Sequence, residues 1–184
     1  MTKAIVIGDG PGGLSAALFL AKNDIDTTVF GLNKTAIHYA LLHNYLGIPE
    51  MDGSDFDAIA RNQATRFGAV IVASLVTSID SAPGGFTVFT DDGQEHKADF
   101  VIIAEGKAMK LAVALDLERT ETGVVVDRHG RTAVPGLYVV GRATNRTRSQ
   151  TIISAGEGAA AALDILSVVH GKDFCDFNER PKAG

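Results

Sequence analysis

The sequence is poor in several residue types, and each shortage excludes a class of protein. Among its 184 residues there is one cysteine, Cys175, so the chain can form no internal disulfide, no CxxC redox pair and no cysteine-based zinc site. Basic residues are not in excess, since 17 Lys and Arg stand against 22 Asp and Glu, giving a net charge of −5. This balance argues against binding to nucleic acid or to an anionic membrane.

Long apolar runs and targeting segments are also missing. No apolar run approaches the roughly 18 residues of a membrane span, so none is expected. The first residues, Met1-Thr2-Lys3, lead directly into a strand-like run without the charged and apolar regions of a secretory signal. We therefore expect a cytoplasmic protein.

What the sequence does contain is typical of one globular domain. Hydrophobic residues make up 46% and charged residues 21%, and a length of 184 residues fits a single domain. Glycine is frequent at 20 residues, while tryptophan is absent. A glycine-rich, aromatic-poor chain favours tight backbone packing and close approach of a ligand to the backbone.

Apolar runs and helical spacing alternate along the chain, which predicts an α/β fold with a central parallel sheet and a small antiparallel meander. Strands are predicted over residues 4–7, 27–30, 70–79, 86–90, 100–104, 123–127 and 136–140. Helices are predicted over 11–22, 55–67 and 150–170, with shorter ones over 39–43 and 107–117. Ser54 is the expected N-cap of the second helix, and Gly171 ends the last. Residues 1–171 are read as one domain, and 172–184 as a polar tail with few contacts.

A glycine motif joins the first strand to the first helix. Gly8-Asp9-Gly10-Pro11-Gly12-Gly13 satisfies G-x-G-x-x-G. In such a motif the first glycine allows a tight turn, the second lets a pyrophosphate approach, and the last lets helix and strand pack closely. The N–H groups that begin the helix attract an anion. The strand–turn–helix context indicates a dinucleotide site; a glycine-rich turn needed only for packing is the alternative.

The acidic residue that normally binds the adenosine ribose is missing from its expected place. It should follow the second strand, where this chain has Phe30-Gly31 and then Leu32 and Asn33. The ribose must then be held by backbone groups, by Asn33 or by Lys34.

Several ordered motifs together resemble the FAD domain of the thioredoxin reductase family, the class II pyridine nucleotide–disulfide oxidoreductases. The resemblance covers residues 3 to about 171. It rests on the glycine motif, on Asn44-Tyr45-Leu46-Gly47-Ile48-Pro49, on the strand ending Ala104-Glu105-Gly106, on Val134 to Arg142, and on Gln150 to Gly158.

The resemblance implies a Rossmann-like, three-layer FAD/NAD(P)-binding fold with FAD as its cofactor, and a homodimer. Together with the ribose argument above, it places these positions in the predicted cofactor site: Gly8, Gly10, Pro11, Gly12, Gly13, Gly31, Asn33, Lys34, Asn44, Val76, Ala104, Glu105, Gly106, Gly141, Arg142, Gln150 and Thr151. Gln150 and Thr151 would bring a helix N-terminus to the flavin and stabilise its anionic reduced form. An ordinary helix start with Ser149 as N-cap is the alternative. No metal site and no catalytic acid or base is predicted.

Three departures from the family pattern bear on function. Only residues 107 to about 120 stand where the family inserts its NAD(P)H domain with the redox CxxC, which is too short for a domain. Arg142 replaces an Asp and could pair with a pyrophosphate oxygen. Glu105 replaces a Thr, and its carboxylate is expected to face either solvent or the cofactor's phosphates.

These observations support a flavoprotein oxidoreductase whose reductant comes from outside the chain: free NAD(P)H, a quinone or a partner reductase. A non-catalytic FAD- or nucleotide-binding module, acting as a sensor or subunit, is the second hypothesis. A scaffold without a cofactor is the third, and the retained motif glycines and the Gln150 segment argue against it.

Overall fold

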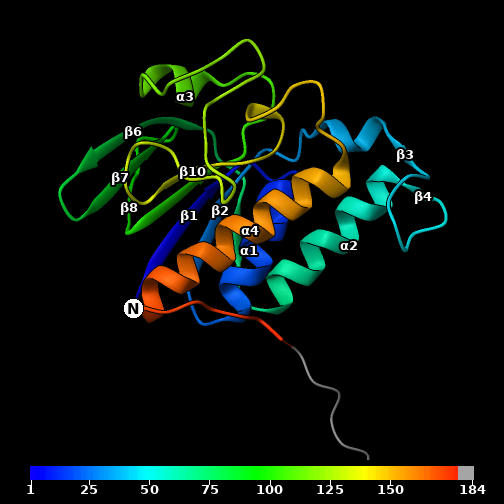
Figure 1. The fold of residues 1–184 in the computed structure, drawn as a ribbon, viewed down its shortest axis with the longest axis horizontal. Coiled ribbons are helices and arrows are strands. Elements are labelled where there is room, and N and C mark those ends of the chain that lie inside the picture. Colours follow the sequence, from blue (N-terminus) through cyan, green and yellow to red (C-terminus); the bar gives the residue numbers. More distant parts are fainter. Residues whose placement is uncertain (178–184) are drawn as a thin grey trace, which may run out of the picture.

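The computed structural model describes residues 1–177, which form a three-layer α/β fold (Figure 1). A five-stranded sheet in the order β10-β9-β1-β2-β5 is the middle layer, and all of its pairings are parallel. Its strands are β1 (Lys3–Ile7), β2 (Asp26–Phe30), β5 (Val70–Val72), β9 (Phe100–Ile103) and β10 (Leu137–Val139). The predicted central parallel sheet is therefore confirmed.

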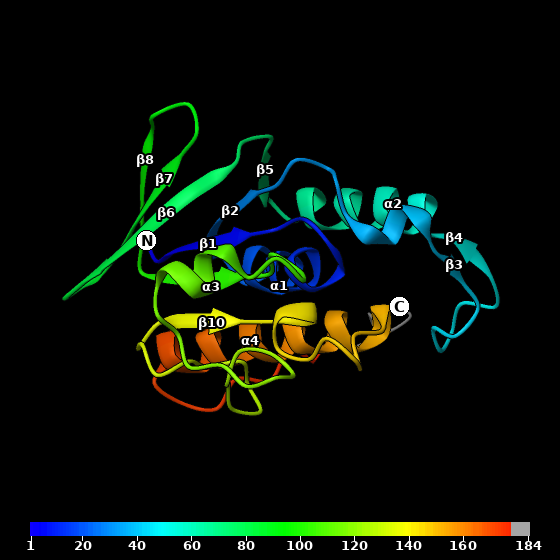
Figure 2. The ribbon, with the colours of Figure 1, turned by 90° about the horizontal axis from the view of Figure 1, so that it is seen from above.

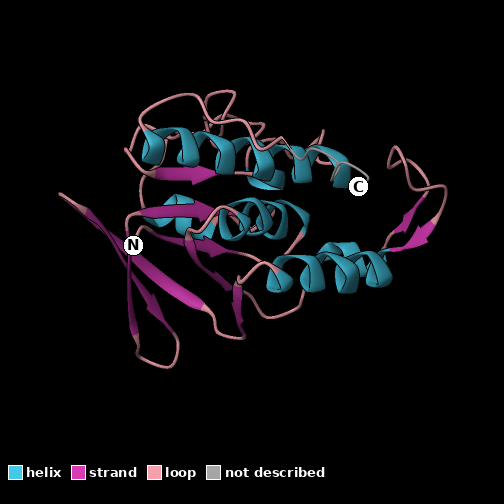
Figure 3. Ribbon diagram, turned by 90° about the horizontal axis from the view of Figure 1, so that it is seen from below, coloured by secondary structure: helices cyan, strands magenta, loops and turns pink. Residues whose placement is uncertain are grey.

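Helices form one outer layer and an antiparallel meander forms the other. The helices α1 (Pro11–Lys22), α2 (Gly53–Arg66) and α4 (Thr151–His170) run side by side in Figure 1. The meander consists of β6 (Val76–Ala82), β7 (Gly85–Thr90) and β8 (Glu95–Ala98) and projects from one end of the molecule (Figure 2). A two-stranded sheet of β3 (Leu41–Leu42) and β4 (Met51–Asp52) lies at the opposite end (Figure 3). Short helices complete the fold: η1 (Ala36–Tyr39), α3 (Lys110–Ala114) and η2 (Gly141–Ala143).

The continuous apolar strands are explained by burial of both faces of the sheet. Successive side chains of a strand point to opposite faces. In β1, Ile5 and Ile7 therefore join the core under the meander, whereas Ala4 and Val6 join the core under the helices. A strand covered on both faces needs apolar residues at every position, which is why the sequence shows runs rather than alternation.

Two predicted elements have different bounds or composition in the structure. The single run predicted over 70–79 is two strands, because residues 70–72 pair with β2 while residues from 76 onward pair with β7. Between them Ser74 leaves the ladder, and its hydroxyl donates to Asp91 at 2.8 Å. The expected N-cap Ser54 lies inside α2; the cap is Asp52, whose side chain accepts from the Ser54 N–H at 2.9 Å.

Three weaker predictions need larger corrections. The strand predicted over 123–127 is absent, and only one isolated bridge, from Arg119 to Val124, occurs there. The helix predicted over 39–43 is the 3₁₀ turn η1, which ends at Tyr39 before the chain enters β3. The helix predicted over 107–117 shortens to α3. In each case the segment is too short for periodicity to distinguish a helix or strand from a loop.

The last helix and the residues after it pack onto the fold. By length and composition alone α4 could cross a membrane. Ala161, Ile165 and Leu166 of this helix are nevertheless buried in the core beside α1. Beyond it, Phe174 packs against the same core and Asp176 pairs with Lys22 at 2.6 Å. The tail was expected to make few contacts, so its described part is better anchored than predicted; residues 178–184 lie outside the described part.

Candidate functional site

The carboxyl ends of four strands meet at one edge of the sheet, which we call the carboxyl edge. Backbone hydrogen bonds join them: Gly8 N donates to Phe30 O at 2.8 Å, Ala104 N to Ile7 O at 2.7 Å, and Val140 N to Ile103 O at 3.0 Å. Strand β1 is central, and the chain places β2 on one side of it and β9 on the other. Ligands of open α/β sheets bind at such a switch point, just outside the strand ends.

The glycine motif forms the floor of this edge. Gly8 has φ of +110°, and a Cβ there would lie 2.3 Å from Ala104 O. A Cβ on Gly13 would lie 1.9 Å from Gly8 O, so the helix reaches the strand only because that side chain is missing. Pro11 occupies the first turn of α1, which has no side-chain cap and no acidic residue. The first-turn N–H groups are thus left for an anionic ligand.

Arg142 lies on the same edge and carries a buried polar atom without a partner. It is in the turn η2 directly after β10. Its Nε is completely buried and makes no hydrogen bond to any residue between 1 and 177. An orphaned guanidinium N–H is costly unless an acceptor arrives. A phosphate is the acceptor that a guanidinium fits best, so the donor set suits a pyrophosphate.

Glu157 of α4 holds the turn that carries Arg142. Its Oε2 accepts from Gly141 N at 2.6 Å and from the Thr144 hydroxyl at 3.1 Å. Burial raises the pKa of the Glu157 carboxyl, although these two hydrogen bonds act in the opposite direction. The turn is therefore anchored from the helix side, and sequence reasoning missed Glu157 because its role depends on contacts across the fold.

Glu105 is half-buried and has hydrogen-bond partners that the sequence did not predict. Its carboxylate turns to α3 and accepts from Leu111 N at 3.0 Å and from Ala112 N at 3.1 Å. The negative charge thus caps the start of a helix, where free N–H groups and the dipole favour it. The carboxylate was expected to face solvent or phosphates; Glu105 is half-buried, and its hydrogen-bond partners belong to α3.

Two segments predicted to flank the flavin meet in space. The Asn44 side-chain amide donates to Gln150 Oε1 at 3.3 Å, and both side chains are exposed. Gln150 is the N-cap of α4, and its side chain makes no capping bond. Ser149 is therefore not the cap. The first turn of α4, which includes Thr151, is free of acidic residues and remains open to a ligand.

The other predicted residues are less uniform in their surroundings. Val76 is 7% exposed, with its side chain in the core under the meander. Lys34 is exposed on the loop after β2. Asn33 has φ of 55°, and its backbone N–H donates to Asp9. Gly106 turns the chain after β9 with φ of +71°.

A buried ionic network beside Gly31 was not predicted. Asp9 and Asp57 flank Arg61 of α2: the Asp9 Oδ2 is 2.5 Å from Arg61 Nη2, and the Asp57 Oδ2 is 2.7 Å from Arg61 Nε. His38 Nε2 lies 3.1 Å from the Asp57 Oδ2. Burial lowers the pKa of Arg61, but the hydrogen bonds to both carboxylates outweigh it, so the net shift is upward. The position of Asp9 between two motif glycines was the available signal.

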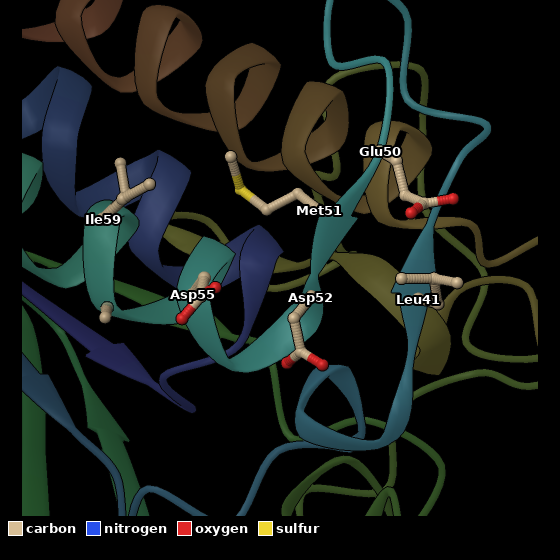
Figure 4. Close-up of a pocket in the computed structure, with 7 residues that line it drawn as sticks. Leu41, Glu50, Met51, Asp52, Asp55 and Ile59 are labelled. Atoms are coloured by element: carbon tan, nitrogen blue, oxygen red, sulfur yellow. The ribbon is translucent and has the colours of Figure 1, made fainter.

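A separate groove lies between β4 and the start of α2 (Figure 4). Its lining combines acidic side chains, Glu50, Asp52 and Asp55, with apolar ones, Leu41, Met51, Ala58 and Ile59. Asp52 is occupied in capping α2, and the hydrogen bond from the Ser54 N–H lowers its pKa. None of the residues predicted to bind the cofactor lines this groove.

Known proteins are similar to this chain in sequence. The family model described as pyridine nucleotide-disulphide oxidoreductase matches residues 46–159. The thioredoxin reductase of Rickettsia prowazekii is 30% identical over 128 residues, covering 67% of this chain and 41% of that protein. The thioredoxin reductase of Schizosaccharomyces pombe is 26% identical over 185 residues, covering 94% and 55%. The chain thus spans about half the length of these curated relatives.

Solved structures show the same fold. An atypical thioredoxin reductase from Desulfovibrio vulgaris Hildenborough superposes with a TM-score of 0.85 at 19% identity, covering 96% of this chain and 100% of that chain. A thioredoxin reductase from Gloeobacter violaceus gives a TM-score of 0.86 at 18% identity, covering 97% and 100%.

Proposed function

Since the chain belongs to the pyridine nucleotide-disulphide oxidoreductase family, we propose that it is an FAD-dependent oxidoreductase without its own nicotinamide domain or redox disulfide. Thioredoxin reductases of this family bind FAD, and bound FAD supplies the electron-transfer chemistry. The observation that carries the proposal is the meeting of the glycine motif, Arg142 and the start of α4 at one carboxyl edge.

The residues present fit FAD at its charged and polar ends. The uncapped N–H groups of α1 and the orphaned Arg142 Nε offer donors for the pyrophosphate. The open first turn of α4, with Thr151 and the Asn44–Gln150 pair beside it, offers donors and a positive dipole for the flavin pyrimidine. No side chain is assigned as a catalytic acid or base.

The electron donor in this proposal comes from outside the chain. Between β9 and β10 the chain holds α3 and loops, and Leu111 and Ala112 of α3 are buried against the domain. The Glu105 carboxylate accepts a hydrogen bond from Leu111 N of this segment. The only cysteine of the sequence, Cys175, is exposed near the C-terminus. Free NAD(P)H, a quinone or a partner reductase are the candidate donors.

We further propose a homodimer in the cytoplasm. Pairing of flavin domains follows the resemblance to the thioredoxin reductase family, and the α4 residues Ile152, Ile153, Val168 and Val169 leave apolar surface exposed that a second copy could cover.

A non-catalytic FAD- or nucleotide-binding module is the alternative. The absence of a carboxylate at Gly31 and the Arg142 departure favour it, because they change how the cofactor is held without adding a group for turnover.

The test has two stages. The visible absorption spectrum of the freshly purified protein is recorded, and the supernatant is read again after heat denaturation. We expect a yellow protein that releases FAD. A colourless, folded protein that takes up no added FAD would overturn the proposal. NADH and NADPH oxidation and quinone reduction by the FAD-loaded protein then separate the oxidoreductase from the binding module.

A further inference from the structure

The place where a ribose-binding acid is expected holds the carboxylate of Asp9. Three atoms of Asp9 lie nearest to the position of a Cβ on Gly31: Cγ at 2.2 Å, Oδ2 at 2.4 Å and Cβ at 2.5 Å. Gly31 does not have a positive φ, so its backbone could carry a side chain. The space beside it is closed only because the Asp9 side chain fills it.

We propose that Asp9 binds the adenosine ribose hydroxyls in place of the missing acid at the end of β2. The proposal rests on the proposed function, in which an adenine dinucleotide lies along the carboxyl edge. Acids at the end of the second strand accept hydrogen bonds from the ribose 2′-hydroxyl in folds of this kind. Asp9 brings a carboxylate to the same strand end from the glycine motif instead of from β2.

The two oxygens of Asp9 have different surroundings. Oδ2 accepts from Asn33 N at 2.8 Å and from Arg61 Nη2 at 2.5 Å. Oδ1 makes no hydrogen bond within residues 1–177, and the Asp9 side chain as a whole is 7% exposed. One oxygen therefore fixes the side chain, and the other is left as an acceptor for a hydroxyl.

Arg61 explains how an acid is tolerated inside a phosphate-binding motif. An unpaired carboxylate between Gly8 and Gly10 would repel a pyrophosphate, and the Arg61 guanidinium compensates that charge. The Asp57 carboxylate binds Nε of the same guanidinium and keeps it from turning to the ligand. Arg61 and His38 both lie against these carboxylates, with His38 Nε2 3.1 Å from the Asp57 Oδ2, and the group nearest to Gly31 is the Asp9 carboxylate. A carboxylate at this place suits a ribose diol and disfavours a 2′-phosphate.

The test uses ADP and 2′-deoxy-ADP as probes of the adenosine half of the site. Their dissociation constants are measured by calorimetry on cofactor-free protein, in parallel with the FAD dissociation constant. We expect the wild-type chain to bind ADP at least tenfold more tightly than 2′-deoxy-ADP. In Asp9→Asn the ratio of the 2′-deoxy-ADP dissociation constant to the ADP dissociation constant should fall to within twofold of one, because a charged acceptor is lost. Asp55→Asn, an exposed change on the same helix as Arg61, should keep the wild-type ratio.

A double variant that moves the carboxylate to position 31 distinguishes ribose binding by Asp9 from a merely structural role. Gly31→Asp alone should be strongly destabilised by the overlap with Asp9, whereas Asp9→Gly/Gly31→Asp returns a carboxylate to the end of β2 and should restore the preference for ADP. The proposal is overturned if wild type binds both probes equally, if Asp9→Asn keeps the preference, or if it weakens both probes alike. The FAD dissociation constant is measured separately from the ratio of the two probes. Failure of the wild-type chain to bind FAD would therefore overturn the proposed function instead.

Discussion

The Asn44 amide donates a hydrogen bond to the Gln150 side chain at 3.3 Å, although the two residues are 106 positions apart. Asn44 lies in the loop after β3, and Gln150 caps α4. The contact joins the hairpin end of the molecule to the helix whose N-terminus is open. The resemblance places both residues at the flavin end of the site, and the fold brings their two segments together.

Gln150→Ala is expected to weaken FAD binding about 2- to 10-fold, since a neutral hydrogen bond contributes about 0.5–1.5 kcal/mol. Asn44→Ala should act in the same direction. Flavin fluorescence titration of the cofactor-free protein measures both. The control is Asn62→Ala, an exposed amide on α2, which should leave the affinity unchanged. Equal affinity in all three variants would remove both residues from the site.

Arg142→Met is expected to weaken FAD binding at least 10-fold, because a hydrogen bond to a charged group contributes about 1.5–3 kcal/mol. It should leave the melting temperature of the cofactor-free protein unchanged or higher, since it removes a buried N–H without a partner. Arg128→Met, at an exposed position, is the matched control. A variant that loses stability while keeping its FAD affinity would show that Arg142 is structural.

Alanine substitutions at two glycines of α4 should change the stability of the protein in opposite directions. A Cβ on Gly158 would lie 2.0 Å from Gly12 O, whereas a Cβ on Gly156 meets nothing within 4 Å. Gly158→Ala should therefore force α1 and α4 apart, lowering the melting temperature and the FAD affinity together. Gly156→Ala should raise the free energy of unfolding by about 0.5–1 kcal/mol through helix propensity. Thermal unfolding of the pair measures this, and a Gly158→Ala protein as stable as wild type would contradict the packing argument.

Glu157 should make stability depend on pH. Its pKa in the folded state is raised, chiefly by burial, so the folded protein holds this proton to a higher pH than the unfolded chain. Stability is then lost as pH rises from the ordinary glutamate pKa, about 4.3, through the raised value. Glu157→Gln should remove that loss and be relatively more stable at pH 7 than at pH 4. Denaturant unfolding at both pH values tests this, with Glu50→Gln at an exposed site as control. If the free energies of unfolding of Glu157→Gln and wild type differed by the same amount at both pH values, the prediction would be contradicted.

Local signals predicted the first unit of the fold well. The apolar run of β1, the glycine turn, the helical spacing of α1 and the strand β2 follow one another within thirty residues, and all three elements occur where expected. The run over 70–79 was harder, because its division into β5 and β6 depends on which distant strands each half pairs with. Periodicity describes one segment and carries no information about its partners.

By itself, the sequence determined the α/β class and the glycine motif with the dinucleotide site it implies, because strand runs, turn glycines and helix starts are local properties of the chain. Only the tertiary structure decided which side chains meet: Asp9 with Arg61, Glu105 with the start of α3, and Asn44 with Gln150. The direction of a loop side chain follows no periodic pattern in the sequence. It is set by whichever charge or N–H group the folded chain brings within reach, so these partnerships exist only once distant segments have packed together.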